Sequence, residues 1–275
     1  MKKRAALVLF CMFLFRSAYS LGDYIPPEVV QALKNSDVDG AIRAIRLDAN
    51  TPRLKYLLNE LVRVEKGEGA FKRLTPREFF NLCVGYHNIY LFLKGMGEEG
   101  LPFFKKADSC YQKVSKKRGA DERVIIGILR SALYHAAGNH QKAEEIFAKL
   151  DISGLEDSFR KYEALAHYFA AKGDVDGVVS NLRLAYAIRP DAILSWVVVS
   201  DDFTNVSSDP KFSALIEEWK KESSARKAGE EGEKNIKKSR DKDKKGSKGK
   251  KKLQSQKAAK GKASTSLKKT SPKRR

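Results

Sequence analysis

The four histidines are the first side chains to consider for chemistry, because imidazole binds metal ions and transfers protons near neutral pH. They are His87, His135, His140 and His167. No two of them share one helical face at the spacing of a metal-ligating pair, and His135 and His140 are five residues apart. No cysteine stands beside a histidine in a ligand pattern. Structural histidines are therefore favoured over a metal site.

A glycine-rich segment and several acidic pairs are the other chemical candidates. Residues 95–100 read Gly-Met-Gly-Glu-Glu-Gly, the spacing of a dinucleotide-binding motif. The segment follows an expected helix and puts two carboxylates where a pyrophosphate would lie, so a flexible turn is favoured. Acidic pairs such as Glu144 and Glu145 point to different helical faces, and no serine or cysteine lies in a nucleophile motif. We expect neither an enzyme nor a cofactor site.

Residues 1–20 have the organisation of a bacterial export signal. Lys2, Lys3 and Arg4 precede an apolar run over residues 5–15, and Ala18-Tyr19-Ser20 has small residues at the two sites that define cleavage. The run is shorter than the ~20 residues that span a bilayer. Cleavage after residue 20 is favoured over an uncleaved anchor or a buried helix. The mature protein is then expected outside the cytoplasmic membrane, in the periplasm or another extracytoplasmic location, in some cases at the membrane surface.

Two cysteines remain once this signal is removed. Cys83 and Cys110 fall in two segments that are expected to form one helical hairpin. An exported protein reaches an oxidising compartment, so a disulfide across the hairpin is one reading. Two small buried apolar side chains are the other.

The body of the chain has helical periodicity almost throughout. Apolar residues recur at spacings of three and four over 124–149 and 159–188, and each stretch is interrupted near its middle by Gly-Asn or Gly-Asp. Thr75-Pro76 and Asp209-Pro210 are typical helix starts. Further helices are expected over residues 28–34, 38–47, 52–65, 76–94, 103–117, 191–199 and 211–222.

The two interrupted stretches repeat one another with a period of about 35 residues. In residues 159–192 the residues at positions 4, 7, 8, 11, 15, 24, 27 and 32 are Tyr162, Leu165, Ala166, Phe169, Gly173, Leu182, Ala185 and Pro190. This pattern resembles a tetratricopeptide (TPR) repeat, with Val178 replacing the usual alanine. Residues 124–157 match less fully, since Gly127 and Arg130 depart from the pattern. A degenerate third unit would pair the helix that starts at Thr75-Pro76 with Ala107, Tyr111 and Val114.

The resemblance implies an all-α fold, a right-handed superhelical stack of antiparallel helix hairpins. Single hairpins cannot bury their own apolar faces, so at least three units are expected. We expect four regions: the signal over 1–20, a half-repeat-like helical region over 21–75, TPR-like repeats with a closing helix over 76–222, and a disordered lysine-rich tail over 223–275.

TPR repeats hold a partner peptide or helix in a concave groove that is lined by the first helix of each unit. In the units over residues 124–157 and 159–192, these positions hold a mixture of apolar and polar side chains. For each of them the alternative is that the side chain packs on a neighbouring helix and does not line the groove. The two units lack the Lys and Asn pattern that clamps a terminal carboxylate in some family members. The predicted lining is Ile125, Ile128, Ala132, His135, Arg160, Glu163, His167 and Ala171.

The formal net charge of +20 is confined to the two ends of the chain. Residues 21–222 hold 29 basic and 29 acidic side chains, whereas residues 223–275 hold 21 basic and 5 acidic ones. The tail contains no aromatic residue and few large aliphatics, so disorder is expected. Its lysines and arginines are expected to attract polyanions, and a purely solubilising role is the alternative. The basic side chains that we single out are Lys248, Lys250, Lys251, Lys252, Lys268, Lys269, Lys273, Arg274 and Arg275.

These features together predict a non-enzymatic adaptor of the bacterial cell envelope. The groove would hold an envelope protein or peptide, while the tail adheres to anionic membrane or an envelope polymer. The alternative is a nucleic-acid-associated protein, in which residues 1–20 are not a signal and the tail binds nucleic acid.

Overall fold

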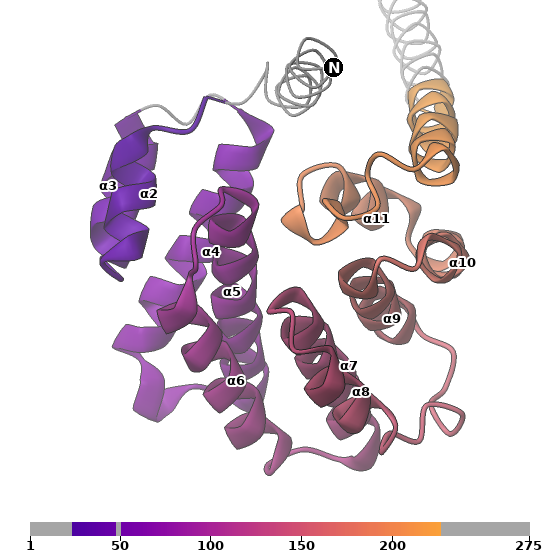
Figure 1. Ribbon diagram of the computed structural model, residues 1–275, viewed down its shortest axis with the longest axis horizontal. Helices are drawn as coiled ribbons and strands as arrows, with labels where there is room; N and C mark the ends of the chain where they lie inside the picture. Colours follow the sequence, from indigo (N-terminus) through magenta and orange to yellow (C-terminus); the bar gives the residue numbers. More distant parts are fainter. Residues whose placement is uncertain (1–23, 48–50, 227–275) are drawn as a thin grey trace, which may run out of the picture. The chain divides into compact units, whose positions relative to one another are not determined.

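The computed structural model describes residues 24–47 and 51–226, and every regular element in these ranges is helical (Figure 1). The predicted export signal and the tail residues from Lys248 onward lie outside them. The helices are α2 (Pro27–Lys34), α3 (Val38–Leu47), α4 (Pro52–Gly69), α5 (Pro76–Gly95), α6 (Leu101–Ser115), α7 (Ala120–Ala136), α8 (His140–Phe147), α9 (Phe159–Lys172), α10 (Val175–Ile188), α11 (Pro190–Val197) and one over residues 210–226, with short 3₁₀ helices η1 (Phe71–Arg73) and η2 (Asp201–Phe203).

The chain divides into two compact units, with the boundary between Glu218 and Trp219. Nearly all described residues belong to the first unit. In the second unit, helix continues over residues 219–226, beyond position 223, where the tail was expected to begin.

The helix starts and turns follow the predicted local signals. The Thr75 hydroxyl accepts a hydrogen bond from the Glu78 backbone N–H, and the Glu78 carboxylate accepts one from the Thr75 N–H, which is a complete capping box. Gly138 and Gly173 have φ angles of 79° and 80°, which favour glycine at the turns after α7 and α9. Three signals that were read from sequence therefore mark where α5 begins and where α7 and α9 end.

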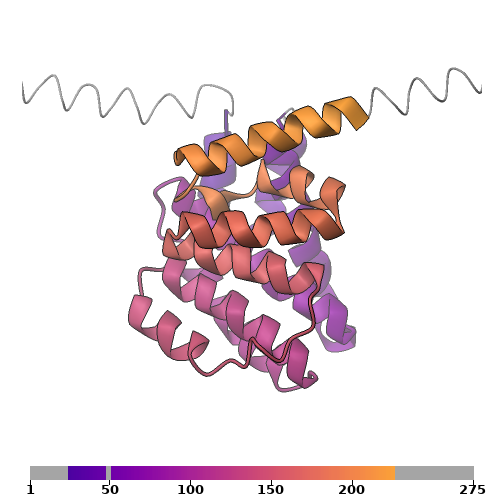
Figure 2. The same ribbon diagram turned by 90° about the vertical axis from the view of Figure 1, so that its right-hand side faces the viewer.

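The helices pack in neighbouring pairs. α5 packs with α6, α7 with α8, and α9 with α10, and α7 also contacts α9. The hairpins α7–α8 and α9–α10 lie one above the other in Figure 2. Four small residues on these helices, Ala107, Ala143, Ala166 and Ala185, are each fully buried, which allows close packing of neighbouring helices.

The two departures from the repeat pattern in α7 have structural reasons. A Cβ atom on Gly127 would lie 2.5 Å from Cδ2 of Leu150, so glycine leaves room for Leu150 to pack on α7. Nε of Arg130 lies 2.6 Å from Oδ1 of Asp108 on α6, which ties this hairpin to the preceding one. Gly127 therefore allows close packing within the hairpin, and Arg130 links the hairpin to α6.

The two cysteines of the α5–α6 hairpin are joined as a disulfide. The Cα atoms of Cys83 and Cys110 are 5.3 Å apart, within the usual range for such a bond. The two cysteines therefore form the disulfide and are not two separate buried thiols. Both residues are also buried in the core, so the covalent link reinforces a contact between helices that apolar packing already makes.

Candidate partner-binding groove

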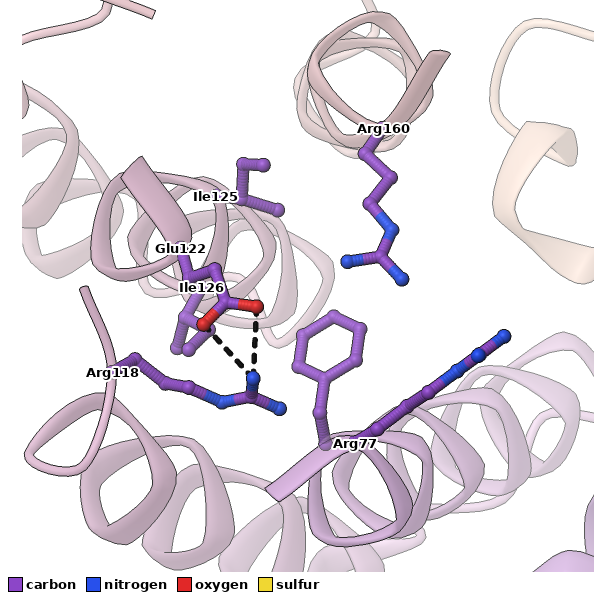
Figure 3. A pocket seen from close by; sticks show the side chains of 7 residues that line it. Arg77, Arg118, Glu122, Ile125, Ile126 and Arg160 are labelled. Carbon is purple, nitrogen blue, oxygen red and sulfur yellow. Dashed lines mark hydrogen bonds and ion pairs between the residues drawn. The ribbon is translucent and has the colours of Figure 1, made fainter. Parts of the chain in front are cut away.

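The first helices of the three hairpins, α5, α7 and α9, line a common groove. At one end of it lies a pocket of about 230 Å³, the mouth pocket, which takes residues from all three helices (Figure 3). Its lining is Arg77, Phe80, Arg118, Glu122, Ile125, Ile126 and Arg160.

A second pocket of about 210 Å³, the inner pocket, shares Phe80, Ile125 and Arg160 with the mouth pocket. The remaining lining residues come mainly from the same three helices, with Arg63 from α4 and Tyr111 from α6. They are Arg63, Asn81, Val84, His87, Asn88, Tyr111, Leu129, Glu163, Ala164 and His167. Because the two pockets share three residues, they form one groove along α5, α7 and α9.

A segment of the chain itself crosses the groove beyond the inner pocket. η2 contacts both α5 and α9, and Asp202 and Phe203 are buried there. Nη2 of Arg53 lies 2.5 Å from Oδ1 of Asp201, which fixes the segment to α4. A third pocket of about 560 Å³ lies beside this crossing, with Ala132 and Ala171 in its wall. The groove is therefore open at the mouth and inner pockets and occupied by η2 farther along.

A buried ion pair holds η2 on α9. Nδ1 of His167 lies 2.8 Å from Oδ1 of Asp202, without the alignment of a hydrogen bond. Burial opposes charge on both groups. The Asp202 carboxylate nevertheless raises the pKa of His167, and the imidazolium lowers the pKa of Asp202. The Ser200 hydroxyl also contacts Asp202. His167 thus acts as an anchor for the crossing segment.

His87 is a neutral histidine at the floor of the inner pocket. Its Nδ1 atom lies 3.2 Å from the Tyr111 hydroxyl, and Nε2 has no hydrogen-bond partner among the described residues. Burial lowers the pKa of His87 to about 4, although the nearby Asp202 opposes the shift. The floor is therefore polar and uncharged at this point at neutral pH.

The mouth pocket is rich in arginine. The Arg118 guanidinium is bound by both carboxylate oxygens of Glu122, at 2.8 and 2.9 Å (Figure 3). Arg77 and Arg160 are exposed, and within the described ranges neither forms an ion pair. Burial raises the pKa of Glu163, one turn along α9 from Arg160, and the positive charges of His167 and Arg160 partly oppose the shift. Two arginines are thus free to meet a ligand, and the third is neutralised within the pocket.

Four of the six residues chosen from the sequence as principal groove residues line the groove. Ile125 and Arg160 contribute to both pockets, and Glu163 and His167 contribute to the inner one. His167 is paired with Asp202, so only the other three are placed to contact a partner.

Ile128 and His135 were predicted to line the groove, and this prediction is wrong. Ile128 is fully buried in the core. His135 is also buried, with Nδ1 at 2.8 Å from Nδ1 of His140 and Nε2 at 3.1 Å from Oε1 of Glu144, both on α8. The physical reason is the rotation of α7 about its own axis, which turns these two positions toward the helices on which α7 packs.

Sequence reasoning missed the contribution of α5 to the groove. Arg77, Phe80, Val84, His87 and Leu91 follow a spacing of three and four, which is one face of a helix. That face could have been identified by extending the repeat register one unit upstream. The loop between α5 and α6 is longer than the usual turn of such a repeat, so the repeat register could not be followed from α7 back into α5.

Within residues 24–47 and 51–226, no three His, Cys, Asp or Glu side chains are placed to hold a metal ion, and no helix is long and apolar enough to cross a membrane. Comparison with family models, curated proteins and solved structures finds no match to the chain.

Proposed function

We propose that the protein is a non-enzymatic scaffold of the bacterial cell envelope that holds a partner peptide or helix in its groove. The observation that carries this proposal is the groove along α5, α7 and α9, whose open part combines apolar Phe80 and Ile125 with exposed arginines. Apolar anchors surrounded by charged side chains are common at peptide-binding surfaces. We assign the repeats to a TPR-like stack on the residue pattern in α7 to α10.

The disulfide supports the exported location. Cys83 and Cys110 are bridged, and such bonds persist mainly outside the cytosol. This agrees with the export signal proposed for residues 1–20. The tail would then adhere to an anionic membrane or envelope polymer, because its positive charge acts on any polyanion within reach.

The alternative, a nucleic-acid-associated protein, rests on the same tail. Its lysines would bind phosphates without reading sequence, but in the cytosol the disulfide would be reduced. Cell fractionation distinguishes the two, since recovery of the protein from the cytoplasm with free thiols would refute the envelope proposal.

Site-specific photo-crosslinking in cells tests the groove. A photoreactive residue in place of Ile125 is expected to form a discrete adduct with a partner protein. The matched control replaces Leu184, an exposed apolar residue of α10 that does not line the pockets. Equal adducts from both positions, or none from Ile125, would show that the groove is not the partner site.

A further inference from the structure

We infer that the groove selects an acidic peptide segment, whose carboxylates lie at the mouth pocket and whose neighbouring apolar side chain enters it. This inference rests on the proposed function and names the chemistry of the partner. It is carried by the charge of the mouth pocket, which holds three arginines and one carboxylate in a chain body that is neutral as a whole.

The position of the arginines defines where a carboxylate would bind. Arg77 comes from the start of α5 and Arg160 from the start of α9, so the two reach the pocket from different hairpins (Figure 3). The only carboxylate in the pocket lining, Glu122, is occupied by Arg118. The guanidinium groups of Arg77 and Arg160 are therefore the ones available for bidentate contacts to an incoming carboxylate.

The apolar part of the pocket defines the second requirement. Phe80, Ile125 and Ile126 line the same pocket as the arginines, in a volume of about 230 Å³. That volume accommodates one leucine- or phenylalanine-sized side chain. An acidic residue alone would leave this apolar surface in water, so an apolar residue next to an acidic one satisfies both parts of the pocket.

The chain's own ends do not fit this description. Residues 1–20 contain four basic side chains and no acid, and residues 223–275 carry a net charge of +16. Like charge disfavours either end at a mouth that already holds two unpaired arginines. The occupant we infer is therefore a segment of another protein.

The test uses the full chain and two twelve-residue fluorescent peptides that also carry a photoreactive group. In one a central leucine is flanked by glutamates, and in the other the glutamates are replaced by lysines. We expect the acidic peptide to bind at least about tenfold more tightly than the basic one, and its cross-links to map to α5, α7 and α9. Mapping separates groove binding from attraction to the basic tail.

Binding of the acidic peptide to three variants tests which part of the pocket is responsible. R77E/R160E is expected to weaken binding of the acidic peptide about tenfold and to remove the groove cross-links. R43E/R46E, with the same change in net charge at exposed sites of α3, is the matched control and is expected to retain them. Ile125→Trp fills the pocket without changing charge and is expected to weaken binding as well.

The results distinguish failure of the inference from failure of the proposed function. If Ile125→Trp weakens both peptides equally while R77E/R160E behaves like R43E/R46E, the groove binds peptides and the acidic selectivity is refuted. If none of the three variants changes binding and all cross-links map outside the groove, the peptide-binding function is refuted with it.

Discussion

His87 is expected to make the folded protein sensitive to acid, and His87→Gln tests this. The ring is buried on α5, and Nε2 has no partner among the described residues. Burial lowers the pKa of His87 to about 4, whereas an unfolded histidine has a pKa of about 6.5. Between these two values the unfolded chain binds a proton that the folded protein does not. The free energy of unfolding must therefore fall as the pH falls through this interval.

The size of the effect follows from the two pKa values. The contribution of His87 is fully present above about pH 6.5 and is lost progressively as the pH falls toward 4. Between about pH 7.5 and about pH 4.5 the linkage relation gives a loss of roughly 2 to 3 kcal/mol. Glutamine keeps a polar side chain at the site and does not titrate, so the variant should lack this part of the acid sensitivity.

Urea unfolding of the oxidised full chain at these two pH values measures the effect. Titrating groups that do not interact with His87 are present in both proteins, so their contributions cancel in the comparison. We expect the wild type to lose roughly 2 to 3 kcal/mol more than His87→Gln between the two conditions. An equal loss in both proteins would refute the reasoning. Titration of the His87 ring by NMR gives a second measurement, in which a midpoint above pH 6 would contradict a buried neutral imidazole even if the variant failed to fold.

Three further predictions concern the covalent link, one turn and the tail. Reducing the Cys83–Cys110 bridge, which closes a loop with a sequence separation of 27, should lower the free energy of unfolding by about 3.5 kcal/mol; equal urea midpoints with and without reductant would contradict this prediction. Gly173→Ala should cost about 1 kcal/mol because φ is 80°, whereas Gly119→Ala, where φ is −63°, should cost clearly less in the same urea assay. Truncation after Arg226 should abolish binding to vesicles that contain anionic lipid, and binding of the full chain should weaken steeply with salt; vesicle binding retained by the truncated protein would assign adhesion to the body.

The helices were predictable because their signals are local. Thr75-Pro76, Gly138 and Gly173 specify where helices begin and turn, and each does so through its own backbone or its neighbours. The repeat register added the pairing of α7 with α8 and of α9 with α10. Such signals do not depend on residues that are far away in the sequence.

The groove was predictable only in part, because its contents depend on distant contacts. His167 lies at a groove position, but Asp202 arrives 35 residues later and pairs with it. The 3₁₀ turn that carries Asp202 is only three residues long and has no periodicity to identify it. The rotation that buries Ile128 and His135 likewise depends on how α7 packs against its neighbours, which spacing within one helix does not determine.

The body of the chain has no net charge, but this total does not describe the charge at any single site. The mouth pocket is such a site, because positive charge remains there. Many acidic side chains of the body are used locally, as Glu78 is in a helix cap and Glu122 is on Arg118. Arg77 and Arg160 have no such partner among the described residues, so positive potential remains where α5 and α9 begin. A partner meets that local potential, because water and salt screen charges more than about 10 Å away. Recognition at the mouth pocket should therefore respond to substitution of Arg77 and Arg160, even though the body has no net charge.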